Sequence, residues 1–330
     1  MYVTNPQVAD VDLAEQLSSR PVIMLMGPTG AGKTDLAVEL VRHLPVDIIS
    51  VDSVMVYRAL DIGTGKPDKR ALEQAPHRLI DVREPEQAYS AAEFRADALR
   101  EIADIHNRAR VPLLVGGTGL YFRALTRGLS LLPAADPSTR ARLAERARAV
   151  GWGSLHADLA TIDPTAAKRI HPNDPQRIQR ALEVYELTGS TLTELQGADL
   201  PLSMPFPSVS LVIAPPDRDQ LHAKIERRFD GMLAAGLVDE VARLRGCANL
   251  HRELPSMRAV GYRQIWEYLE DEVSFASMRE RSLAATRQLA RRQLTWLRAE
   301  SVAVWLDPGG DPLEKALTLI TNSIEIHMGD

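Results

Sequence analysis

The sequence predicts an α/β fold: a parallel sheet flanked by helices, with an all-helical insertion domain. Three observations lead to this prediction. Up to residue 132, short and continuously apolar segments alternate with helical patterns, as in parallel sheets whose strands are buried on both faces. A glycine-rich turn joins the first apolar segment to the first helix. The alternation stops between residues 133 and 203, where only helix signals occur, and resumes at 209.

The individual elements follow from local periodicity. The segments with a buried-strand pattern are 22–26, 46–51, 111–115 and 209–214. Two shorter segments, 77–82 and 302–306, can add further strands. The segments with a helical pattern are 91–107, 219–235, 238–245 and 278–298, besides Leu36, Ala37, Leu40 and Val41 after the glycine-rich turn.

The insertion is marked by signals for the starts and ends of helices. Asp136, Asp163 and Asp174 each stand directly before a proline, which places a good N-cap residue before a residue suited to the first helical position. Gly151 and Gly189 stand where helix-ending glycines belong. We therefore expect three parts: an N-terminal tail at 1–20, an α/β core of 21–132 and 205–330, and a helical insertion at 133–204 that ends in the proline-rich stretch 201–207.

The composition is that of an ordinary globular protein. Of 330 residues, 45% are hydrophobic and 25% charged, and the formal net charge is −5, so a nucleic-acid surface would have to be a local cluster of arginines. Cys247 is the only cysteine, so neither a disulfide framework nor a cysteine-rich zinc site is expected. No apolar run approaches about 18 residues, and residues 1–20 lack a signal pattern. We expect a cytoplasmic monomer that contacts no membrane.

A phosphate-binding motif joins the first strand to the first helix. Its residues are Gly27, Pro28, Thr29, Gly30, Ala31, Gly32, Lys33 and Thr34. They match G-x-x-x-x-G-K-[ST] in full. The glycines let backbone N–H groups turn inward toward an anion, and the helix N-terminus adds positive potential. Lys33 supplies a charge and Thr34 can ligate Mg²⁺. The core is therefore expected to be P-loop NTPase-like and to bind a diphosphate or a triphosphate.

The motif identifies a phosphate ligand but not a reaction. An enzyme that hydrolyses nucleoside triphosphates would usually carry an acid at the end of a second apolar strand, to organise Mg²⁺. The strand at 111–115 ends instead in the glycine-rich run 116–119. Asp52 and Asp81 are the acids that remain at strand ends, and neither has a strong claim to that role.

Several further blocks follow the phosphate loop in a fixed order. They are Asp52-Ser53, residues 61–67 (Asp-Ile-Gly-Thr-Gly-Lys-Pro), 116–121 (Gly-Gly-Thr-Gly-Leu-Tyr), 176–180 (Gln-Arg-Ile-Gln-Arg), 260–264 (Val-Gly-Tyr-Arg-Gln) and 291–298 (Arg-Arg-Gln-Leu-Thr-Trp-Leu-Arg). Together with the loop, these blocks closely resemble the tRNA dimethylallyltransferase (tRNA isopentenyltransferase) family. The resemblance covers about residues 22–298, nearly the whole chain.

The resemblance implies a transfer reaction. In that family the loop holds the diphosphate of dimethylallyl diphosphate, and N6 of adenine 37, beside the anticodon of tRNA, attacks C1 of the allyl group. Asp52 matches the family's general base, which helps a weakly nucleophilic amine. Fixed donors stabilise the leaving diphosphate. Lys33, Thr34 and Thr118 match this role, and we expect Arg218 to join them. The implied cofactor is Mg²⁺, with Thr34 as a ligand.

The resemblance also implies residues that contact the anticodon stem-loop of tRNA. They are Asp52, Ser53, Val54, Met55, Thr118, Arg140, Gln176, Arg177, Ile178, Gln179, Arg180, Met257, Arg258, Ala259, Val260, Gly261, Tyr262, Arg291 and Arg292. Met55 departs from the family, because many members carry Gln at this position. An amide contact to the adenine is therefore not expected here.

Three arginine-rich helical faces favour a nucleic-acid surface. In 138–150 four arginines accompany one acid, and in 281–298 five arginines accompany none. On the helix between them, Arg177 and Arg180 share one face and apolar residues take the other. Such faces suit contacts to a phosphate backbone, although any one of them can be merely solvated. The apolar residues of the middle helix are Ile178, Leu182 and Tyr185, and the stripe on the last helix is Arg287, Arg291 and Arg298.

Other interpretations remain open at this level. Asp52 and Thr118 can each simply cap a turn, and Arg218 can be a solvated residue at a helix start. The chain can be a P-loop kinase for a small hydroxylated metabolite, with Asp52 as base and the insertion as a lid. It can also be a nucleotide-switched RNA-binding module. A kinase requires ATP binding, whereas a switch changes its RNA affinity with NTP and yields no product.

Overall fold

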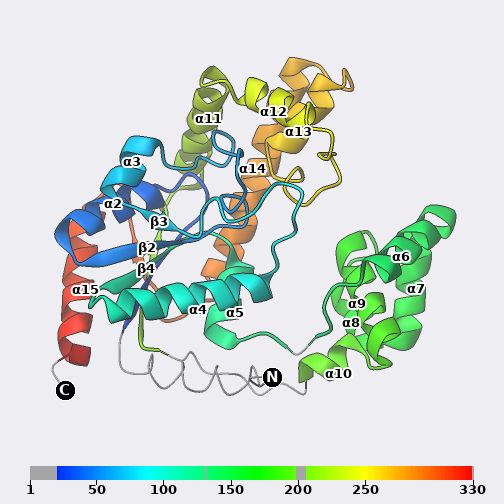
Figure 1. Cartoon of the computed structure of the whole chain (residues 1–330), viewed down its shortest axis with the longest axis horizontal. Helices are drawn as coiled ribbons and strands as arrows, with labels where there is room; N and C mark the ends of the chain where they lie inside the picture. Colours follow the sequence, from blue (N-terminus) through cyan, green and yellow to red (C-terminus); the bar gives the residue numbers. More distant parts are fainter. Residues whose placement is uncertain (1–20, 131, 198–205, 329–330) are drawn as a thin grey trace, which may run out of the picture. The chain divides into compact units, whose positions relative to one another are not determined.

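The computed structural model describes residues 21–130, 132–197 and 206–328. The chain forms two compact units (Figure 1), which we call the core unit (Met1–Leu125 with Met204–Asp330) and the helical unit (Thr126–Ser203). The expected tail at 1–20 and most of the proline-rich stretch 201–207 lie outside the described residues. Among the residues that are described, no helix is both long enough and apolar enough to cross a membrane.

A parallel sheet lies at the centre of the core unit, with the strand order β3-β2-β4-β1-β5-β6. Its strands are β1 (Val22–Met26), β2 (Val46–Val51), β3 (His77–Arg78), β4 (Val111–Gly116), β5 (Ser208–Ile213) and β6 (Val304–Leu306). This confirms the predicted α/β fold. Because all six strands run the same way, their carboxyl ends meet at one edge, where ligands of such sheets usually bind.

The strand bounds agree with the sequence except at the two outermost strands. The four central strands lie within one residue of their expected ends. The third strand is much shorter than the expected 77–82, because Leu79 and Asp81 adopt positive φ values of 61° and 55° and turn the backbone out of the sheet. The last strand, expected at 302–306, begins only at Val304.

The central strands send alternate side chains into two separate cores. Ile23 and Leu25 pack with α2 (Lys33–His43) and α15 (Pro312–Met328). Met24 and Met26 pack with α4 (Ala91–Asn107) and α5 (Gly119–Arg127) on the opposite face. All four side chains are buried, which explains why these strands are apolar without a break.

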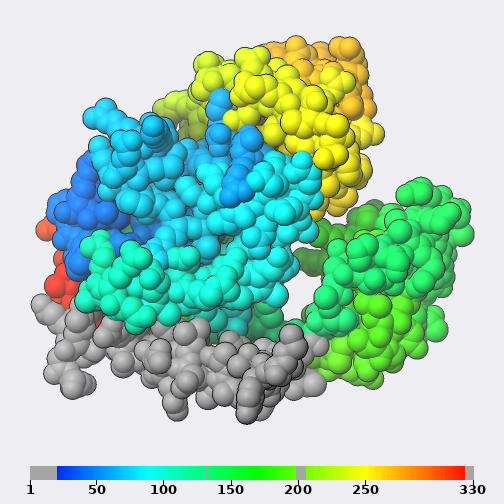
Figure 2. Space-filling model, in the orientation of Figure 1, coloured from blue at the N-terminus to red at the C-terminus, as the bar shows by residue number. Residues whose placement is uncertain are grey.

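A third core joins four later helices to the segment that follows β2. The helices are α11 (Arg218–Ala234), α12 (Leu237–Arg245), α13 (Tyr262–Leu269) and α14 (Phe275–Leu297). They enclose Val56 and Leu60, and Figure 2 shows the yellow segment after α12 packed beside blue and cyan residues. The helices expected at 219–235, 238–245 and 278–298 are confirmed. The short helix α3 (Lys69–Gln74), together with α5, α13 and α15, was not expected.

The helical unit contains only helices among its described residues. They are α6 (Pro137–Val150), α7 (Trp152–Ile162), α8 (Pro164–Arg169), α9 (Pro175–Thr188) and α10 (Leu192–Gly197). Asp136, Asp163 and Asp174 cap α6, α8 and α9, as their positions before proline predicted. Tyr185, which we expected on the buried face of α9, is 37% exposed, because Val184 takes the buried position in that turn.

We predict that Leu114→Ala lowers the free energy of unfolding of the core unit by about 2–5 kcal/mol. Leu114 is fully buried in β4, a central strand of the sheet, so truncation leaves a cavity that the neighbouring strands cannot close. Urea unfolding followed by circular dichroism measures the change. Leu120→Ala is the matched control: its side chain is 60% exposed and the change should stay within about 0.5 kcal/mol. Equal effects of the two variants would contradict the assigned core.

Candidate active site

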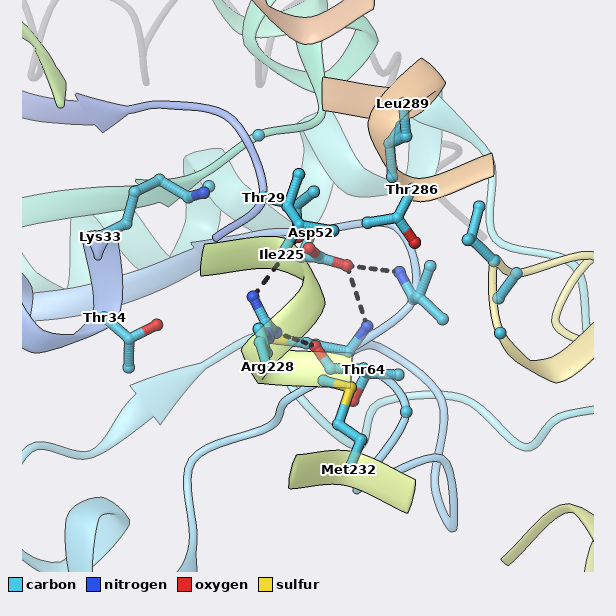
Figure 3. A pocket seen from close by; sticks show the side chains of 18 of the residues that line it. Thr29, Lys33, Thr34, Asp52, Thr64, Ile225, Arg228, Met232, Thr286 and Leu289 are labelled. Atoms are coloured by element: carbon cyan, nitrogen blue, oxygen red, sulfur yellow. Dashed lines mark hydrogen bonds between the residues drawn. The ribbon is translucent and has the colours of Figure 1, made fainter. Parts of the chain in front are cut away.

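A pocket of about 160 Å³ lies at the carboxyl edge of the sheet. Its lining includes the polar residues Lys33, Thr34, Asp52 and Arg228 (Figure 3). It also includes several apolar residues, namely Ile225, Phe229, Met232, Leu237 and Leu289. The pocket therefore suits a ligand with an anionic head and a hydrocarbon tail.

The phosphate loop forms as the sequence predicted, between β1 and α2. Gly30 and Gly32 take positive φ values of 79° and 96°, which residues with side chains rarely adopt. Lys33 begins α2, and its Nζ donates to the carbonyl oxygens of Gly27 (3.0 Å) and Pro28 (2.9 Å). Burial, together with the nearby charge of Arg228, lowers the pKa of Lys33 to about 8.

Arg228 is the second cation of the pocket, and it was missed from the sequence. Its guanidinium lies between the phosphate loop and the loop after β2, donating to Thr29 Oγ1 (3.4 Å) and to the carbonyl of Thr64 (3.2 Å) (Figure 3). Burial lowers its pKa, and the carboxylate of Asp52 opposes the shift. The sequence does carry a signal for Arg228: it lies three residues after Ile225, which places an arginine beside the buried apolar stripe of α11.

The block at 61–67 builds the support for Arg228. Gly65 has a positive φ of 66°, and a β-carbon at this position would overlap the Arg228 guanidinium. Only glycine therefore lets the loop close over that side chain. Lys66 is almost fully buried, and its Nζ donates to Asp61 (2.6 Å) and Asp81 (2.7 Å). Asp81, one of the two acids at strand ends, is thus part of this loop's structure.

A buried carboxylate holds the same loop from the other side. Glu240 in α12 is 3% exposed. It accepts the amide N–H groups of Asp61 (3.2 Å), Ile62 (2.8 Å) and Gly63 (3.2 Å) and the hydroxyl of Tyr262 (2.5 Å). Four donors offset the cost of burying the charge. Hydrogen bonding to Glu240 and burial also raise the pKa of Tyr262.

Asp52 faces the pocket from the turn that follows β2. Its Oδ1 accepts the amide N–H groups of Val54 (2.8 Å) and Met55 (3.2 Å), as Figure 3 shows. The capping role that the sequence left open is therefore present. Among the described residues, no hydrogen-bond donor lies on Oδ2, so one carboxylate oxygen remains for a ligand.

Thr118 supports this turn from the end of β4. Its Oγ1 accepts the amide N–H of Ser53 (3.2 Å), and its own amide donates to the carbonyl of Val51 (3.3 Å). Thr118 does not line the pocket, although Asp52, which follows Val51, does. In this structure Thr118 fixes the neighbours of Asp52.

Comparisons with known proteins point to one family. The model of the IPP transferase family matches residues 55–300. A tRNA dimethylallyltransferase of Alkalilimnicola ehrlichii is 59% identical over 294 residues, which cover 89% of this chain and 92% of that protein. The chain belongs to the IPP transferase family. It is thus a tRNA-modifying prenyltransferase.

Solved structures of IPP transferases share the fold. The tRNA isopentenylpyrophosphate transferase of Bacillus halodurans matches with a TM-score of 0.68 and 34% identity, covering 94% of this chain and 99% of that one. A eukaryotic dimethylallyltransferase, studied acting on tRNA, matches with a TM-score of 0.76 and 25% identity, covering 92% of this chain and 79% of that one.

Arg218 does not line the pocket at the carboxyl edge of the sheet, although we expected it to join Lys33 and Thr34 there. It begins α11 and lines a second pocket of about 580 Å³, where its Nε lies 3.4 Å from His222 Nε2. Arg228, ten residues further along the chain, is the arginine that reaches the phosphate loop. The second pocket is also lined by the arginine stripe that the sequence predicted on α14, namely Arg287, Arg291 and Arg298.

Three residues that the family resemblance assigned to tRNA contact are fully buried. The side chains of Ile178, Met257 and Tyr262 are 0% exposed, because they pack inside their units, so these side chains cannot contact RNA. Ala259, Val260 and Gly261 line the pocket at the carboxyl edge of the sheet. Arg258 is exposed and pairs with Glu253 (3.1 Å), and Arg291 and Arg292 are exposed on α14.

A buried acid organises the arginines of the helical unit. Glu183 is 0% exposed and accepts from Arg140 Nε (2.8 Å), Arg180 Nη1 (2.7 Å) and the amide of Asp136 (2.9 Å). Arg180 also donates to the carbonyl of Pro133 (2.7 Å). From the sequence we expected Arg180 to share an RNA-facing side of the helix with Arg177. In the structure Arg180 instead pairs with the buried carboxylate of Glu183. Gln176 and Arg177 remain exposed on α9, whereas Gln179 is half-buried and donates through Nε2 to the carbonyl of Arg140 (2.9 Å).

The pocket at the carboxyl edge of the sheet offers oxygen ligands of the kind that Mg²⁺ takes. The Thr34 hydroxyl and the Asp52 carboxylate both line it. Mg²⁺ usually binds through one or two such groups together with water and substrate phosphates. Among the described residues, no group of three His, Cys, Asp or Glu side chains could hold a metal by itself. The pocket thus fits an ion that arrives with a phosphate ligand.

We predict that the affinity for a diphosphate ligand falls as pH rises through about 8. The pKa of Lys33 is lowered to about 8, so the ammonium is present below that pH and lost above it. If only the ammonium form binds the anion, affinity should fall by roughly tenfold for each further pH unit. Calorimetric titration with dimethylallyl diphosphate between pH 7 and 9.5 measures this. Lys33→Met is the control and should bind more weakly with no inflection; a flat profile for wild type would contradict the assignment.

Proposed function

We propose that this IPP transferase moves a dimethylallyl group from dimethylallyl diphosphate to N6 of adenine 37 in the anticodon stem-loop of tRNA, releasing diphosphate. One observation carries the choice of donor: the same pocket is lined by two cations, Lys33 and Arg228, and by several apolar side chains. A five-carbon allylic diphosphate has the matching combination of a charged head and an apolar tail.

The polar residues that line the pocket would stabilise the leaving diphosphate. As the C1–O bond breaks, negative charge grows on the diphosphate, and fixed donors stabilise that charge. Lys33 and Arg228 supply the charges, and the amides at the start of α2 supply N–H groups. When Mg²⁺ is bound, Thr34 would hold it against the phosphates, where it neutralises further charge.

Asp52 would accept the proton of the attacking amine. N6 forms a bond to C1 of the dimethylallyl group, loses one proton, and the diphosphate leaves with the electron pair of the broken C1–O bond. Oδ1 of Asp52 is held by the amides of Val54 and Met55, which fixes the orientation of the carboxylate and leaves Oδ2 for the proton. Thr118 and Ser53 would support this turn while adenine is bound.

The tRNA would bind through exposed polar residues of both units. Arg177 on α9 and Arg291 and Arg292 on α14 have exposed side chains without acidic neighbours closer than 3.5 Å among the described residues. Arginine forks match phosphate oxygens. A eukaryotic relative is known in a structure acting on tRNA, which supports this partner. Met55 lines the pocket, so its thioether would face the adenine with van der Waals contact only.

We predict that Asp52→Asn reduces transfer by roughly 10²–10⁴-fold. An asparagine oxygen can still accept from Val54 and Met55, so the turn survives, but the amide cannot take up a proton. Incubation with dimethylallyl diphosphate and unmodified tRNA, followed by mass analysis of the nucleosides, measures the product.

The wild-type protein in the same assay tests the proposed function itself. Absence of a dimethylallyl adenosine product with every unmodified tRNA would overturn it. Transfer is compared at saturating donor, because the Asp52 charge also interacts with Lys33 and Arg228 and its removal alters donor affinity. Wild-type turnover in Asp52→Asn would remove Asp52 as the base while leaving the transfer reaction in place.

We predict that Arg177→Ala weakens tRNA binding and makes its salt dependence shallower, by roughly 0.7–0.9 in the slope of log affinity against log salt. The Arg177 side chain is 71% exposed, 3.5 Å from Asp174, so its removal leaves the core of the helical unit intact. Filter binding across a salt series measures the slope. Arg100→Ala is the control, an equally exposed arginine on α4. Identical slopes for Arg177→Ala and wild type would show that this face of α9 is only solvated.

A further inference from the structure

The side chain of Gln293 connects α14 to the phosphate loop. Its Oε1 accepts the amide N–H of Thr29 (2.8 Å), and its Nε2 donates to the carbonyl of Gly117 (3.0 Å). A backbone N–H can only donate and a carbonyl can only accept, so the orientation of the carboxamide is fixed by its partners. Gln293 therefore spans the ends of β1 and β4, two adjacent strands of the sheet.

The glycine-rich run after β4 gives α14 room to come this close. A β-carbon at position 117 would overlap the Gln293 carboxamide, and one at position 119 would overlap the ring of Trp296, one turn further along α14. This is the place at which an enzyme that hydrolyses nucleoside triphosphates carries its acid for Mg²⁺. Here a carboxamide from another helix occupies it.

The bridge changes what the phosphate loop can offer to a ligand. A phosphate loop binds its anion through backbone N–H groups. The backbone N–H of Thr29 already donates to Gln293, and its hydroxyl oxygen already accepts from Arg228. The amides toward Lys33 and Thr34, at the start of α2, remain. Gln293 also lines the pocket itself; its Oε1 is occupied by Thr29 and one N–H of its Nε2 by Gly117, so the carboxamide has only one N–H left to offer a phosphate oxygen.

We propose that Gln293 determines how many phosphates the loop accepts, admitting a diphosphate and excluding a triphosphate. The inference rests on the proposed function, in which the donor is a diphosphate. Gln293 closes the loop at Thr29, so two phosphates fill the donors near α2 while a third would meet the carboxamide side chain. The side chain is thus a specificity-determining residue, distinct from the groups that stabilise the leaving diphosphate.

The test compares two ligands that differ by one phosphate, dimethylallyl diphosphate and dimethylallyl triphosphate. Calorimetry with Mg²⁺ gives the ratio of their dissociation constants for wild type, Gln293→Ala and Gln293→Leu. Leucine fills a similar volume without hydrogen bonding, so it releases Thr29 while preserving the packing of α14. We expect the preference for the diphosphate to fall roughly tenfold or more in both variants, since two hydrogen bonds are lost.

Gln288→Ala is the matched control, an exposed glutamine on the same helix, and it should keep the wild-type ratio. Gly117→Ala gives an independent approach, because its β-carbon displaces the carboxamide without deleting it; it should shift the ratio in the same direction. An unchanged ratio in both Gln293 variants, or equal weakening of both ligands, would overturn the inference and leave Gln293 as a packing residue. Wild type that binds neither ligand would overturn the proposed function instead.

Discussion

The pocket at the carboxyl edge of the sheet depends on holding two cations, Lys33 and Arg228, close to one carboxylate, Asp52. Lys33 and Arg228 are each shielded from water, and burial lowers the pKa of both. Placed alone, two such charges would repel each other and favour loss of a proton. Asp52 counters this effect at both cations. The arrangement is balanced for a ligand that brings more than one negative charge, which a diphosphate does.

Much of the surrounding structure maintains this arrangement. The loop at 61–67 can pack against Arg228 only because position 65 is glycine. That loop keeps its shape because Glu240 accepts hydrogen bonds from three of its amides. Asp52 keeps its orientation through the turn that Thr118 supports. Residues far apart in the sequence, on α11, on α12 and just after β4, therefore serve one electrostatic arrangement.

Local patterns predicted the sheet and the phosphate loop, because each is encoded within a few consecutive residues. The strands are apolar without a break, and the loop carries its own glycines and lysine. Arg228 and Gln293 escaped prediction because their roles depend on where helices α11 and α14 dock. Arg218 seemed better placed because it follows β5 closely, yet ten residues of helix, about 15 Å, separate it from Arg228. The helical unit shows the same limit: only one acid occurs within 138–150, but Glu183 and Asp158, from other helices, supply partners to arginines of α6.

Different residues of helix α14 line two different pockets. Thr286, Leu289 and Gln293 border the donor pocket, whereas the stripe of Arg287, Arg291 and Arg298 borders the second pocket. Each residue turns a helix by about 100°, so inserting one residue within α14 ahead of Gln293 would bring Arg292 to the place of Gln293, beside the glycine-rich run. A one-residue change of length inside α14 before Gln293 would therefore break the bridge from Gln293 to Thr29 and Gly117, whereas the same change in a loop outside the helix would leave the register of α14 intact.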